Sequence, residues 1–215
     1  MKDIAIYGAG GFGKEVACLL NHINNSCDEK WNIIGFFDDN LEKGTLISHY
    51  GVVLGGINEL NSYDKELALA LAMGSPQYLK NVRNSITNGN VYFPNIIAPD
   101  FGISDIESFS IGEGNIIGWR CSVSCDVTIG NYNILNADIV LGHDVKIDEF
   151  NVIMPDVRIS GEVTMGDCNL LGVGSIILQQ IKIGNNVRLG AGAVLMTKPK
   201  NDSLYIGNPA KLFKF

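Results

Sequence analysis

The sequence predicts an α/β domain over residues 1–92 and an all-β parallel β-helix built from hexapeptide repeats over residues 93–215. Three observations support this prediction. A glycine-rich turn joins a short apolar strand to an amphipathic helix near the N-terminus. An apolar residue then recurs at every sixth position from Ile111 to Leu195, and asparagine recurs at every eighteenth position from Asn115 to Asn169. A period of six fits neither a helix nor an open strand, but it is typical of a hexapeptide β-helix.

The composition predicts a globular protein and excludes several function classes. Hydrophobic residues make up 46% of the chain and charged residues 18%, and the net charge is −7, which argues against nucleic acid or an anionic membrane surface as a partner. No run of 18 apolar residues predicts a membrane span. Glycines and Lys14–Glu15 interrupt the N-terminal apolar run, so no signal peptide is expected. Five irregularly spaced cysteines indicate reduced thiols and a cytoplasmic protein.

The charge is unevenly distributed along the chain. Residues 180–215 carry a net charge of +5, so the remainder carries −12. This basic end suits either a docked polyanionic ligand or a solvated tail. Its charged residues are Lys182, Arg188, Lys198, Lys200, Lys211 and Lys214 against Asp202.

The first ninety residues read as a Rossmann-like unit. The turn Gly8–Gly13 has the pattern G-x-G-x-x-G between a strand and a helix whose apolar face is Val16, Leu19, Leu20 and Ile23. A second strand ends at Asp38-Asp39, where a ribose-binding acid falls in a dinucleotide fold. A third strand follows over residues 66–75, and then a helix with Ser75 as its cap and Pro76 at its first position. The alternative is that the glycines only pack helix against strand.

The hexapeptide run predicts a triangular coil of 18 residues. Its fifteen apolar positions are followed by glycine eight times and by Asn136 and Asp148, residues that tolerate a left-handed backbone, so we expect left-handed angles there. The asparagines predict an inward ladder of side-chain amides, and Val127, Val145 and Val163 recur with the same period. Ile97 and Ile103 extend the run backwards across a two-residue insertion near Phe109-Ser110. The apolar positions are Ile111, Ile117, Val123, Ile129, Leu135, Leu141, Ile147, Ile153, Ile159, Met165, Leu171, Ile177, Ile183, Leu189 and Leu195.

The hexapeptides, a lone Gly-His-Asp at 142–144 and the tail "YIGNPAKLFKF" together resemble the hexapeptide-repeat acyltransferases. With "IYGAGGFGKEVA" and "FFDD", the chain resembles bacterial sugar acetyltransferases that join a small Rossmann-like domain to a left-handed β-helix. That family includes sialic-acid O-acetyltransferases and N-acetyltransferases of nucleotide-linked 4-amino sugars. The resemblance implies a left-handed coil, acetyl-CoA as co-substrate, and a homotrimer with the active site between neighbouring β-helices.

The resemblance also implies roles for individual residues. His143 matches the family's general base, Asp144 the acid beside it, and Asn136 an acceptor-site asparagine. The nucleotide part of the acceptor is expected at Gly8, Gly10, Gly11, Phe12, Gly13, Asp38 and Asp39. The coenzyme A groove is expected at Gly161, Gly172, Gly190 and Ala191. The basic charge of the last coils, rather than the resemblance, makes Lys211 the expected phosphate contact. Some members have histidine in place of Phe12 or of Val152. A mechanism that needs a second histidine after the base is therefore excluded here.

The period of 18 predicts what surrounds His143. Cys125 stacks on one side and Gly161 on the other, where a glycine leaves room for a thioester and a free N–H for the oxyanion. Asp144 stacks between Asp126 and Glu162, and one of these acids is a candidate contact for an amino-sugar ammonium. The alternative for a lone histidine at a turn is a structural role. We expect His22 and His49 to be structural or exposed. Cys121 and Cys125 face opposite sides of the coil and are not a metal pair, and no metal is expected.

These observations predict transfer of an acetyl group from acetyl-CoA to the 4-amino group of a nucleotide-linked amino-deoxy sugar, in surface glycan biosynthesis. His143 acts as general base, and the acceptor attacks directly in a ternary complex rather than through an acylated Cys125. The alternative enzyme is an O-acetyltransferase for sialic acid or a related sugar. The alternative of another class is a non-catalytic β-helix scaffold or nucleotide-sugar sensor.

Overall fold

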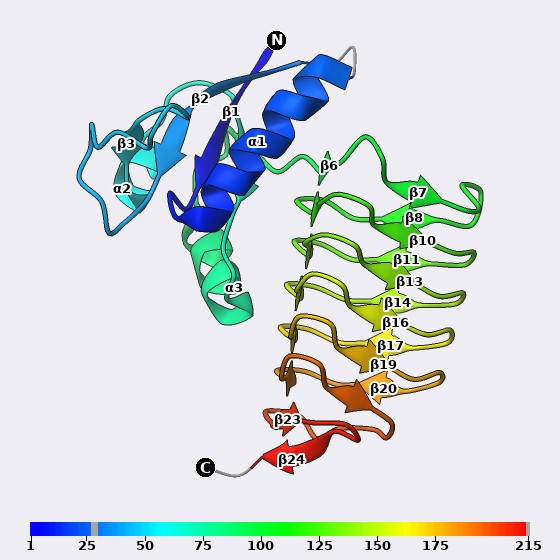
Figure 1. Cartoon of the computed structure of the whole chain (residues 1–215). Coiled ribbons are helices and arrows are strands. Elements are labelled where there is room, and N and C mark those ends of the chain that lie inside the picture. The colour runs from blue at the N-terminus through cyan, green and yellow to red at the C-terminus, as the bar shows by residue number, and fades with distance from the viewer. Residues whose placement is uncertain (27–29, 214–215) are drawn as a thin grey trace. The chain divides into compact units, whose positions relative to one another are not determined.

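The structure, a computed structural model, describes residues 1–26 and 30–213. The chain forms two compact units, Met1–Pro99 and Asp100–Phe215 (Figure 1). Lys214, counted above in the basic end, and Cys27, one of the five cysteines, lie outside the described residues. Among the described residues, no helix combines the length and the apolar character that crossing a membrane requires.

The N-terminal unit is built on one parallel sheet of five strands, in the order β3-β2-β1-β4-β5. The strands are β1 (Lys2–Tyr7), β2 (Trp31–Phe37), β3 (Val53–Gly55), β4 (Leu67–Leu71) and β5 (Val91–Tyr92). The helices are α1 (Gly11–Ser26), α2 (Ile57–Asn61) and α3 (Pro76–Ser85). The predicted α/β unit is therefore confirmed, but β3, α2 and β5 were not predicted.

The predicted apolar faces form the core of this unit. All of β4 is buried, and α1 buries Val16, Leu19, Leu20 and Ile23 against the sheet, as its helical spacing predicts. Helix α3 begins at Pro76 with Ser75 at the N-cap, also as predicted. A proline is tolerated at this position because the first helical N–H has no partner within the helix.

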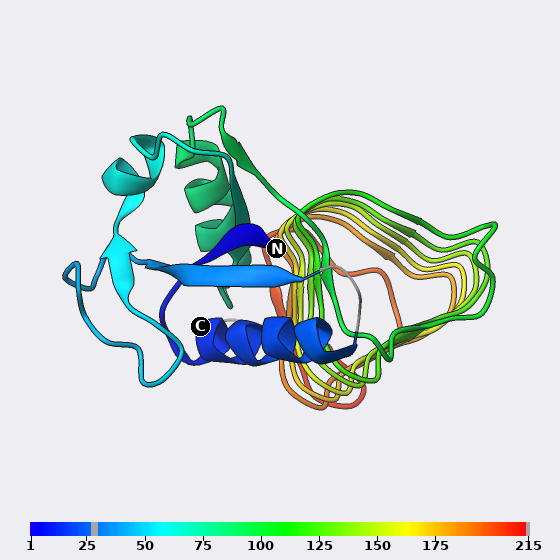
Figure 2. The ribbon, with the colours of Figure 1, turned by 90° about the horizontal axis from the view of Figure 1, so that it is seen from above.

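The direction in which the chain crosses the sheet reverses at the carboxyl ends of β1 and β4. The chain leaves β1 through α1 towards β2 and leaves β4 through α3 towards β5, in opposite directions along the sheet. Right-handed crossovers in opposite directions put the two helices on opposite faces, as Figure 2 shows. The loops after these two strands therefore diverge, and in open α/β sheets such a point is where ligands bind.

The solenoid consists of three sheets of short strands. The eight-stranded sheet contains β6 (Ile96–Ile97), β9 (Ile116–Ile117), β12 (Ile134–Leu135), β15 (Val152–Ile153), β18 (Leu170–Leu171), β21 (Arg188–Leu189), β23 (Leu204–Ile206) and β24 (Lys211–Phe213). The six-stranded sheet contains β7 (Gly102–Ile103), β10 (Ser122–Val123), β13 (Val140–Leu141), β16 (Arg158–Ile159), β19 (Ile176–Ile177) and β22 (Val194–Leu195). The second five-stranded sheet contains β8 (Ser110–Ile111), β11 (Thr128–Ile129), β14 (Lys146–Ile147), β17 (Thr164–Met165) and β20 (Lys182–Ile183).

Strand pairing confirms the coil of 18 residues. Leu141 of β13 pairs in parallel with Ile159 of β16, and Ile147 of β14 pairs with Met165 of β17. Each of the fifteen predicted apolar residues is the second residue of a strand, and all are buried except Ile111, which is half-buried. Ile97 and Ile103 begin the run as predicted. The handedness of the coil stays a prediction.

Each coil turns at three corners, which we name here. The Trp119 corner, between the eight- and six-stranded sheets, comprises residues 118–121, 136–139, 154–157, 172–175 and 190–193. The His143 corner, between the six- and five-stranded sheets, comprises 124–127, 142–145, 160–163 and 178–181. The ladder corner, between the five- and eight-stranded sheets, comprises 112–115, 130–133, 148–151, 166–169 and 184–187.

The predicted asparagine ladder is confirmed. Asn115, Asn133, Asn151 and Asn169 are each 0% exposed. The Oδ1 of Asn133 accepts the backbone N–H of Asn151 at 3.0 Å and its side-chain amide at 3.0 Å, and the Oδ1 of Asn151 does the same for Asn169 at 2.9 and 2.9 Å. Because buried amides need partners, this chain of bonds fixes the register between coils.

A second, outer ladder at the same corner was not predicted. Backbone N–H groups at the turn are capped by side-chain oxygens of the following coil. The N–H of Glu149 donates to Asp167 at 3.0 Å, and the N–H of Asp167 donates to Asn185 at 2.8 Å. The residues involved recur every 18 positions, but their types are a mixture of Asn, Asp and Glu, so the repeat is less visible in the sequence than the inner asparagines.

The predicted position of the left-handed residues is wrong. Positive φ falls two positions later than expected, at fourteen successive turn residues from Gly114 to Gly192 that include Asp144 at 57°. The glycines that follow the apolar residues have another cause, because they lie against the next coil. A Cβ on Gly118 would come within 1.8 Å of the carbonyl oxygen of Asn136, and one on Gly142 within 2.6 Å of the Gly161 nitrogen.

We expect Asn151→Ala to destabilise the solenoid by roughly 3 kcal/mol. The substitution leaves the buried Asn169 N–H without its acceptor. It also removes the side-chain donor to Asn133, whose Oδ1 keeps only the bond from the backbone N–H of residue 151. The measurement is urea unfolding followed by Trp119 fluorescence in a Trp31→Phe background, so that only the solenoid reports.

Gln179→Ala, which removes an exposed amide from the same solenoid, serves as the control and should change the free energy of unfolding by less than about 0.5 kcal/mol. Equal effects of the two substitutions would contradict a structural role for the ladder.

Candidate active site

The glycine-rich turn of the N-terminal unit divides into structural and open positions. Gly8 has a φ of 103°, and a Cβ there would lie 2.6 Å from the carbonyl oxygen of Ala72, while a Cβ on Gly13 would lie 1.9 Å from that of Gly8. These two glycines are required by packing. By contrast, no atom lies within 4 Å of a Cβ on Gly10 or Gly11. The middle of the turn is therefore open to a bound group.

The two acids after β2 hold loops in place. Asp38 accepts the Ala9 N–H at 2.9 Å and so fixes the glycine-rich turn. Asp39 accepts the hydroxyl of Tyr7 at 2.6 Å and the N–H of Ile57, at the start of α2, at 2.8 Å. Burial, and then the hydrogen bond to Asp39, raise the pKa of the Tyr7 hydroxyl, so Tyr7 stays a hydrogen-bond donor. Both carboxylates are therefore positioned at the carboxyl edge of the sheet.

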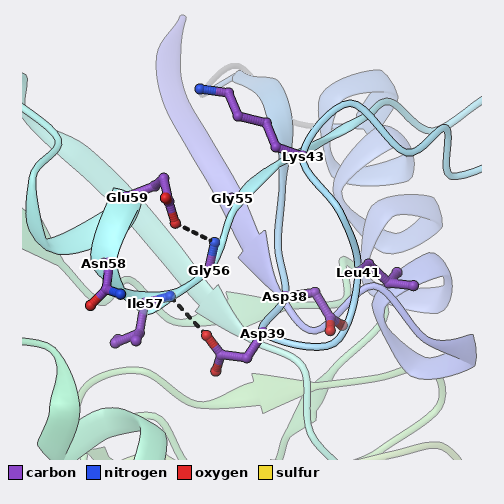
Figure 3. Close-up of a pocket in the computed structure, with 9 residues that line it drawn as sticks. All are labelled: Asp38, Asp39, Leu41, Lys43, Gly55, Gly56, Ile57, Asn58 and Glu59. Atoms are coloured by element: carbon purple, nitrogen blue, oxygen red, sulfur yellow. Dashed lines mark hydrogen bonds between the residues drawn. The ribbon is translucent and has the colours of Figure 1, made fainter.

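A pocket of about 300 Å³ opens beside these acids (Figure 3). The N–H of Gly56 donates to Glu59 at 2.8 Å and lowers the pKa of that carboxyl, so the pocket is acidic. The glycine-rich turn and Phe12 do not line it. Four of its nine lining residues come from β3 and α2, which the sequence did not predict. The lining residues are Asp38, Asp39, Leu41, Lys43, Gly55, Gly56, Ile57, Asn58 and Glu59.

His143 lies in the turn of its corner with one ring nitrogen fixed. Its Nδ1 lies 2.8 Å from the Oδ2 of Asp144, and its side chain is 47% exposed. The left-handed backbone of Asp144 places the two adjacent side chains in this contact. A carboxylate on Nδ1 holds the proton there and leaves Nε2 as the free acceptor, as in an acid–histidine pair that acts as a base.

Gly161 confirms the predicted stacking on the other side of the ring. A Cβ on Gly161 would lie 2.4 Å from Nε2 and 2.6 Å from Cε1 of His143, so the imidazole rests directly against this glycine. Among the described residues, the Gly161 N–H has no hydrogen-bond partner, whereas its carbonyl accepts the N–H of Gln180 at 3.0 Å. The corner therefore offers a base and an N–H donor side by side.

The cysteines near this corner do not form a reactive pair. Cys121 is buried in the coil interior, where burial raises the pKa of its thiol to about 11. Cys125 precedes His143 by one coil and contacts Ser124 at 3.9 Å, while the histidine ring rests on the opposite side, at Gly161. No group of three His, Cys, Asp or Glu side chains within residues 1–26 and 30–213 could hold a metal ion.

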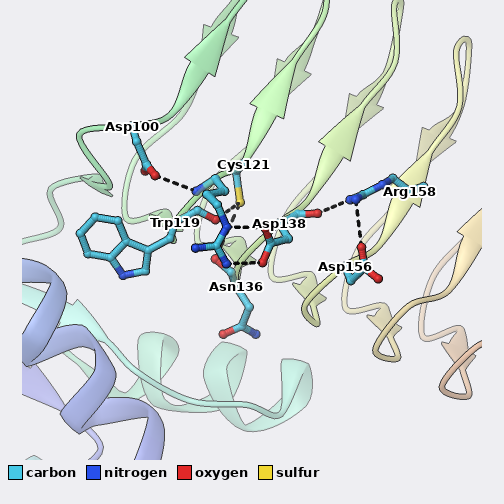
Figure 4. Close-up of polar contacts among 8 residues, drawn as sticks. Asp100, Trp119, Cys121, Asn136, Asp138, Asp156 and Arg158 are labelled. Carbon is cyan, nitrogen blue, oxygen red and sulfur yellow. Dashed lines mark hydrogen bonds and ion pairs between the residues drawn. The ribbon is translucent and has the colours of Figure 1, made fainter.

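Asn136 lies at the Trp119 corner, not beside His143. Its amide contacts the Ile153 carbonyl at 3.3 Å and the sulfur of Met154 at 3.6 Å. Figure 4 shows its side chain pointing away from the ion pairs of this corner.

The ion pairs of the Trp119 corner form a short network. The Arg120 side chain binds Asp138 through Nε at 2.6 Å and through a terminal nitrogen at 2.7 Å. The backbone N–H of Arg120 donates to the Asp100 carboxylate at 3.2 Å. Arg158 bridges the Asp138 carbonyl and the Asp156 carboxylate. The Arg120 guanidinium lowers the pKa of the Asp138 carboxyl. Arg120, Asp138 and Asp156 stand 18 residues apart, but they were not predicted because the residue type at this position changes along the chain.

The residues predicted for coenzyme A also lie at different corners. Gly161 belongs to the His143 corner, Gly172, Gly190 and Ala191 to the Trp119 corner, and Lys211 to β24, where it is exposed. A Cβ on Gly172 would come within 2.6 Å of the Leu189 carbonyl, so coil packing alone explains this glycine. One chain does not bring the predicted set together. His22 and His49 are exposed, and His49 stacks on Tyr50 with ring centroids 4.0 Å apart.

Comparison with known proteins confirms the resemblance that the sequence indicates. Residues 3–86 match the family model of the PglD N-terminal domain. No curated protein matches the chain significantly.

Solved structures match the chain along its whole length. It is 29% identical to the acetyltransferase domain of PglB from Neisseria gonorrhoeae FA1090 in complex with acetyl coenzyme A, with 99% of each chain covered and a TM-score of 0.84. It is 25% identical to PerB from Caulobacter crescentus in complex with CoA and GDP-perosamine, with 100% and 98% covered and a TM-score of 0.84. WeeI from Acinetobacter baumannii AYE, 24% identical with 99% and 100% covered and a TM-score of 0.87, shares the fold. The match to the acetyltransferase domain of PglB confirms the predicted enzyme class, acetyltransferase.

We expect Gly161→Ala to displace the imidazole of His143 by about 1 Å, because the new methyl group would lie far inside the roughly 3.5 Å contact distance of two carbon atoms. A crystal structure of the variant measures the displacement through the distance between Nδ1 and Asp144, which should exceed hydrogen-bonding range. Cys125→Ala, on the opposite side of the ring, is the control and should leave this distance at 2.8 Å. An unmoved ring in Gly161→Ala would contradict the packing described here.

Proposed function

We propose that the chain is an acetyl-CoA-dependent N-acetyltransferase that acts on the 4-amino group of a nucleotide-linked amino-deoxy sugar. The arrangement of His143 carries the proposal, because Nδ1 is held by Asp144 and Nε2 lies against Gly161, whose N–H has no partner among the described residues. The similar structures support the substrates, since one contains acetyl coenzyme A and another contains CoA with GDP-perosamine.

The base and the N–H donor suffice for acetyl transfer. The neutral amine attacks the thioester carbonyl carbon, and Nε2 of His143 takes the proton that the nitrogen loses as the C–N bond forms. Asp144 stabilises the imidazolium through Nδ1. The Gly161 N–H donates to the oxyanion, a contribution that is typically large when the donor is already in place. The C–S bond then breaks, and His143 returns the proton to the CoA sulfur.

The N-terminal unit supplies features for the nucleotide. The open glycines of the turn, Gly10 and Gly11, offer N–H groups at the start of α1 to a diphosphate. The acidic pocket beside Asp38 and Asp39 suits hydroxyl and N–H donors of a ribose and base rather than phosphate. Gly8, Phe12 and Gly13 together determine the shape of this turn.

The division of residues between corners supports a homotrimer. Asn136, Gly172, Gly190 and Ala191 lie at the Trp119 corner, and His143 lies at another. A site that uses both sets therefore needs the Trp119 corner of one copy to face the His143 corner of a neighbour, as the family resemblance implies. In this arrangement Lys211 and the other basic residues of the last coils are available to the phosphates of CoA.

We expect His143→Ala to lower the rate of thiol release from acetyl-CoA by about 10²- to 10⁴-fold, since general base catalysis contributes that much. The acceptors to be compared are UDP-, dTDP- and GDP-linked 4-amino sugars and free sialic acid. Asp144→Asn should lower the rate less, because it leaves the base in place. His49→Ala removes a histidine of the other unit and should leave the rate unchanged.

Each outcome of this assay decides between the candidate functions. Release with a nucleotide-linked amino sugar, lost in His143→Ala, supports the proposal. Release with sialic acid alone would replace it with an O-acetyltransferase. No release with any acceptor would favour the non-catalytic scaffold, and release that survives His143→Ala would remove His143 from the mechanism.

A further inference from the structure

The His143 corner carries more negative charge than a general base requires. Asp126, Asp144 and Glu162 occupy the same left-handed turn position in three successive coils. The sequence of this corner contains no lysine or arginine, and basic residues occur on three adjoining strands, at Lys146 of β14, Arg158 of β16 and Lys182 of β20. Like charges at the same position of successive coils repel one another, so a bound cation stabilises this corner electrostatically.

Glu162 differs from the other two acids in being held in place without a cation. Its Oε1 accepts the side-chain amide of Gln179 at 2.9 Å, and its Oε2 accepts that of Gln180 at 3.1 Å. These donors, Gln180 first, lower the pKa of the Glu162 carboxyl, so it remains an anion at neutral pH. Asp144, in contrast, is engaged by Nδ1 of His143.

Glu162 also lies in the coil that the reactive nitrogen faces. The backbone N–H of Glu162 donates to the His143 carbonyl at 2.8 Å, and the preceding residue, Gly161, is the one against which Nε2 rests. Asp126 belongs to the coil on the opposite side. An acceptor atom that binds Nε2 therefore approaches Glu162 rather than Asp126.

We propose that Glu162, held by Gln179 and Gln180, binds the ammonium form of the acceptor and selects amines over hydroxyl acceptors. The inference rests on the proposed function and answers which acceptor atom that function uses. A sugar amine is largely protonated near neutral pH, and a fixed carboxylate stabilises its positive charge, whereas a neutral hydroxyl gains little. The bound ammonium loses one proton to solvent, and the neutral amine then attacks as described above.

The test compares two ligands that differ in one group. Binding of GDP- and UDP-linked 4-amino-4,6-dideoxy sugars, and of their 4-hydroxy counterparts, is measured by calorimetry on the full chain with CoA present. At low ionic strength Glu162→Gln should weaken binding of the amino sugar about threefold, the usual scale for one exposed charge pair, and leave the hydroxy sugar unchanged. The double variant Gln179→Ala/Gln180→Ala should act in the same direction, because it frees the carboxylate.

Asp167→Asn removes one negative charge from the ladder corner and is the matched control, expected to change neither affinity. Equal weakening of both ligands by Glu162→Gln, or of neither, would overturn the inference even if the chain acetylates an amino sugar. Acetylation of hydroxyl acceptors only would overturn the proposed function itself. The same set of variants therefore distinguishes a failure of the inference about Glu162 from a failure of the proposed function.

Discussion

The solenoid depends on the register that its buried asparagines impose. Each ladder amide bonds to the same residue one coil away, so a coil shifted by one residue would leave several fully buried amides without partners. This constraint extends far beyond the ladder corner. Because the period is fixed at 18, the residue above and below every other side chain is fixed as well. The contact of His143 with Gly161 is one consequence of that register.

The same register explains why much of the solenoid could be predicted from sequence. Because a buried repeat fixes the period, counting residues along the sequence was enough to predict the apolar positions, the asparagine ladder and the neighbours of His143. Fine backbone geometry did not follow. Glycine after the apolar residue suggested a left-handed turn, but it is required there by contact with the next coil, and the left-handed residues are mostly Asp, Asn and larger side chains. A recurring glycine shows that a side chain is excluded at that position. It does not show whether a left-handed backbone angle or contact with the next coil excludes the side chain.

The N-terminal unit was less predictable for a related reason. Its glycine-rich turn and the acids after β2 are local signals, and both were recognised. One wall of the pocket, however, is formed by β3 and α2, which are only three and five residues long and carry no periodic pattern. Asp39 reaches that pocket because its carboxylate binds the N–H of Ile57, a residue eighteen positions away. Such a contact depends on tertiary structure and leaves no trace in spacing.

The two polar corners show how one repeat supports both stability and a reactive site. At the ladder corner, backbone N–H groups of the turn are capped by side chains from the next coil, as Glu149 is by Asp167. At the His143 corner the equivalent cap for Gly161 would come from Gln179, but the amide of Gln179 binds Glu162 instead. Glu162 therefore has two effects: it adds a fixed negative charge, and it binds the Gln179 amide away from the Gly161 N–H, which the proposed mechanism uses as a donor. A solenoid with every turn capped would be more stable at this corner, but it would offer no donor to an oxyanion.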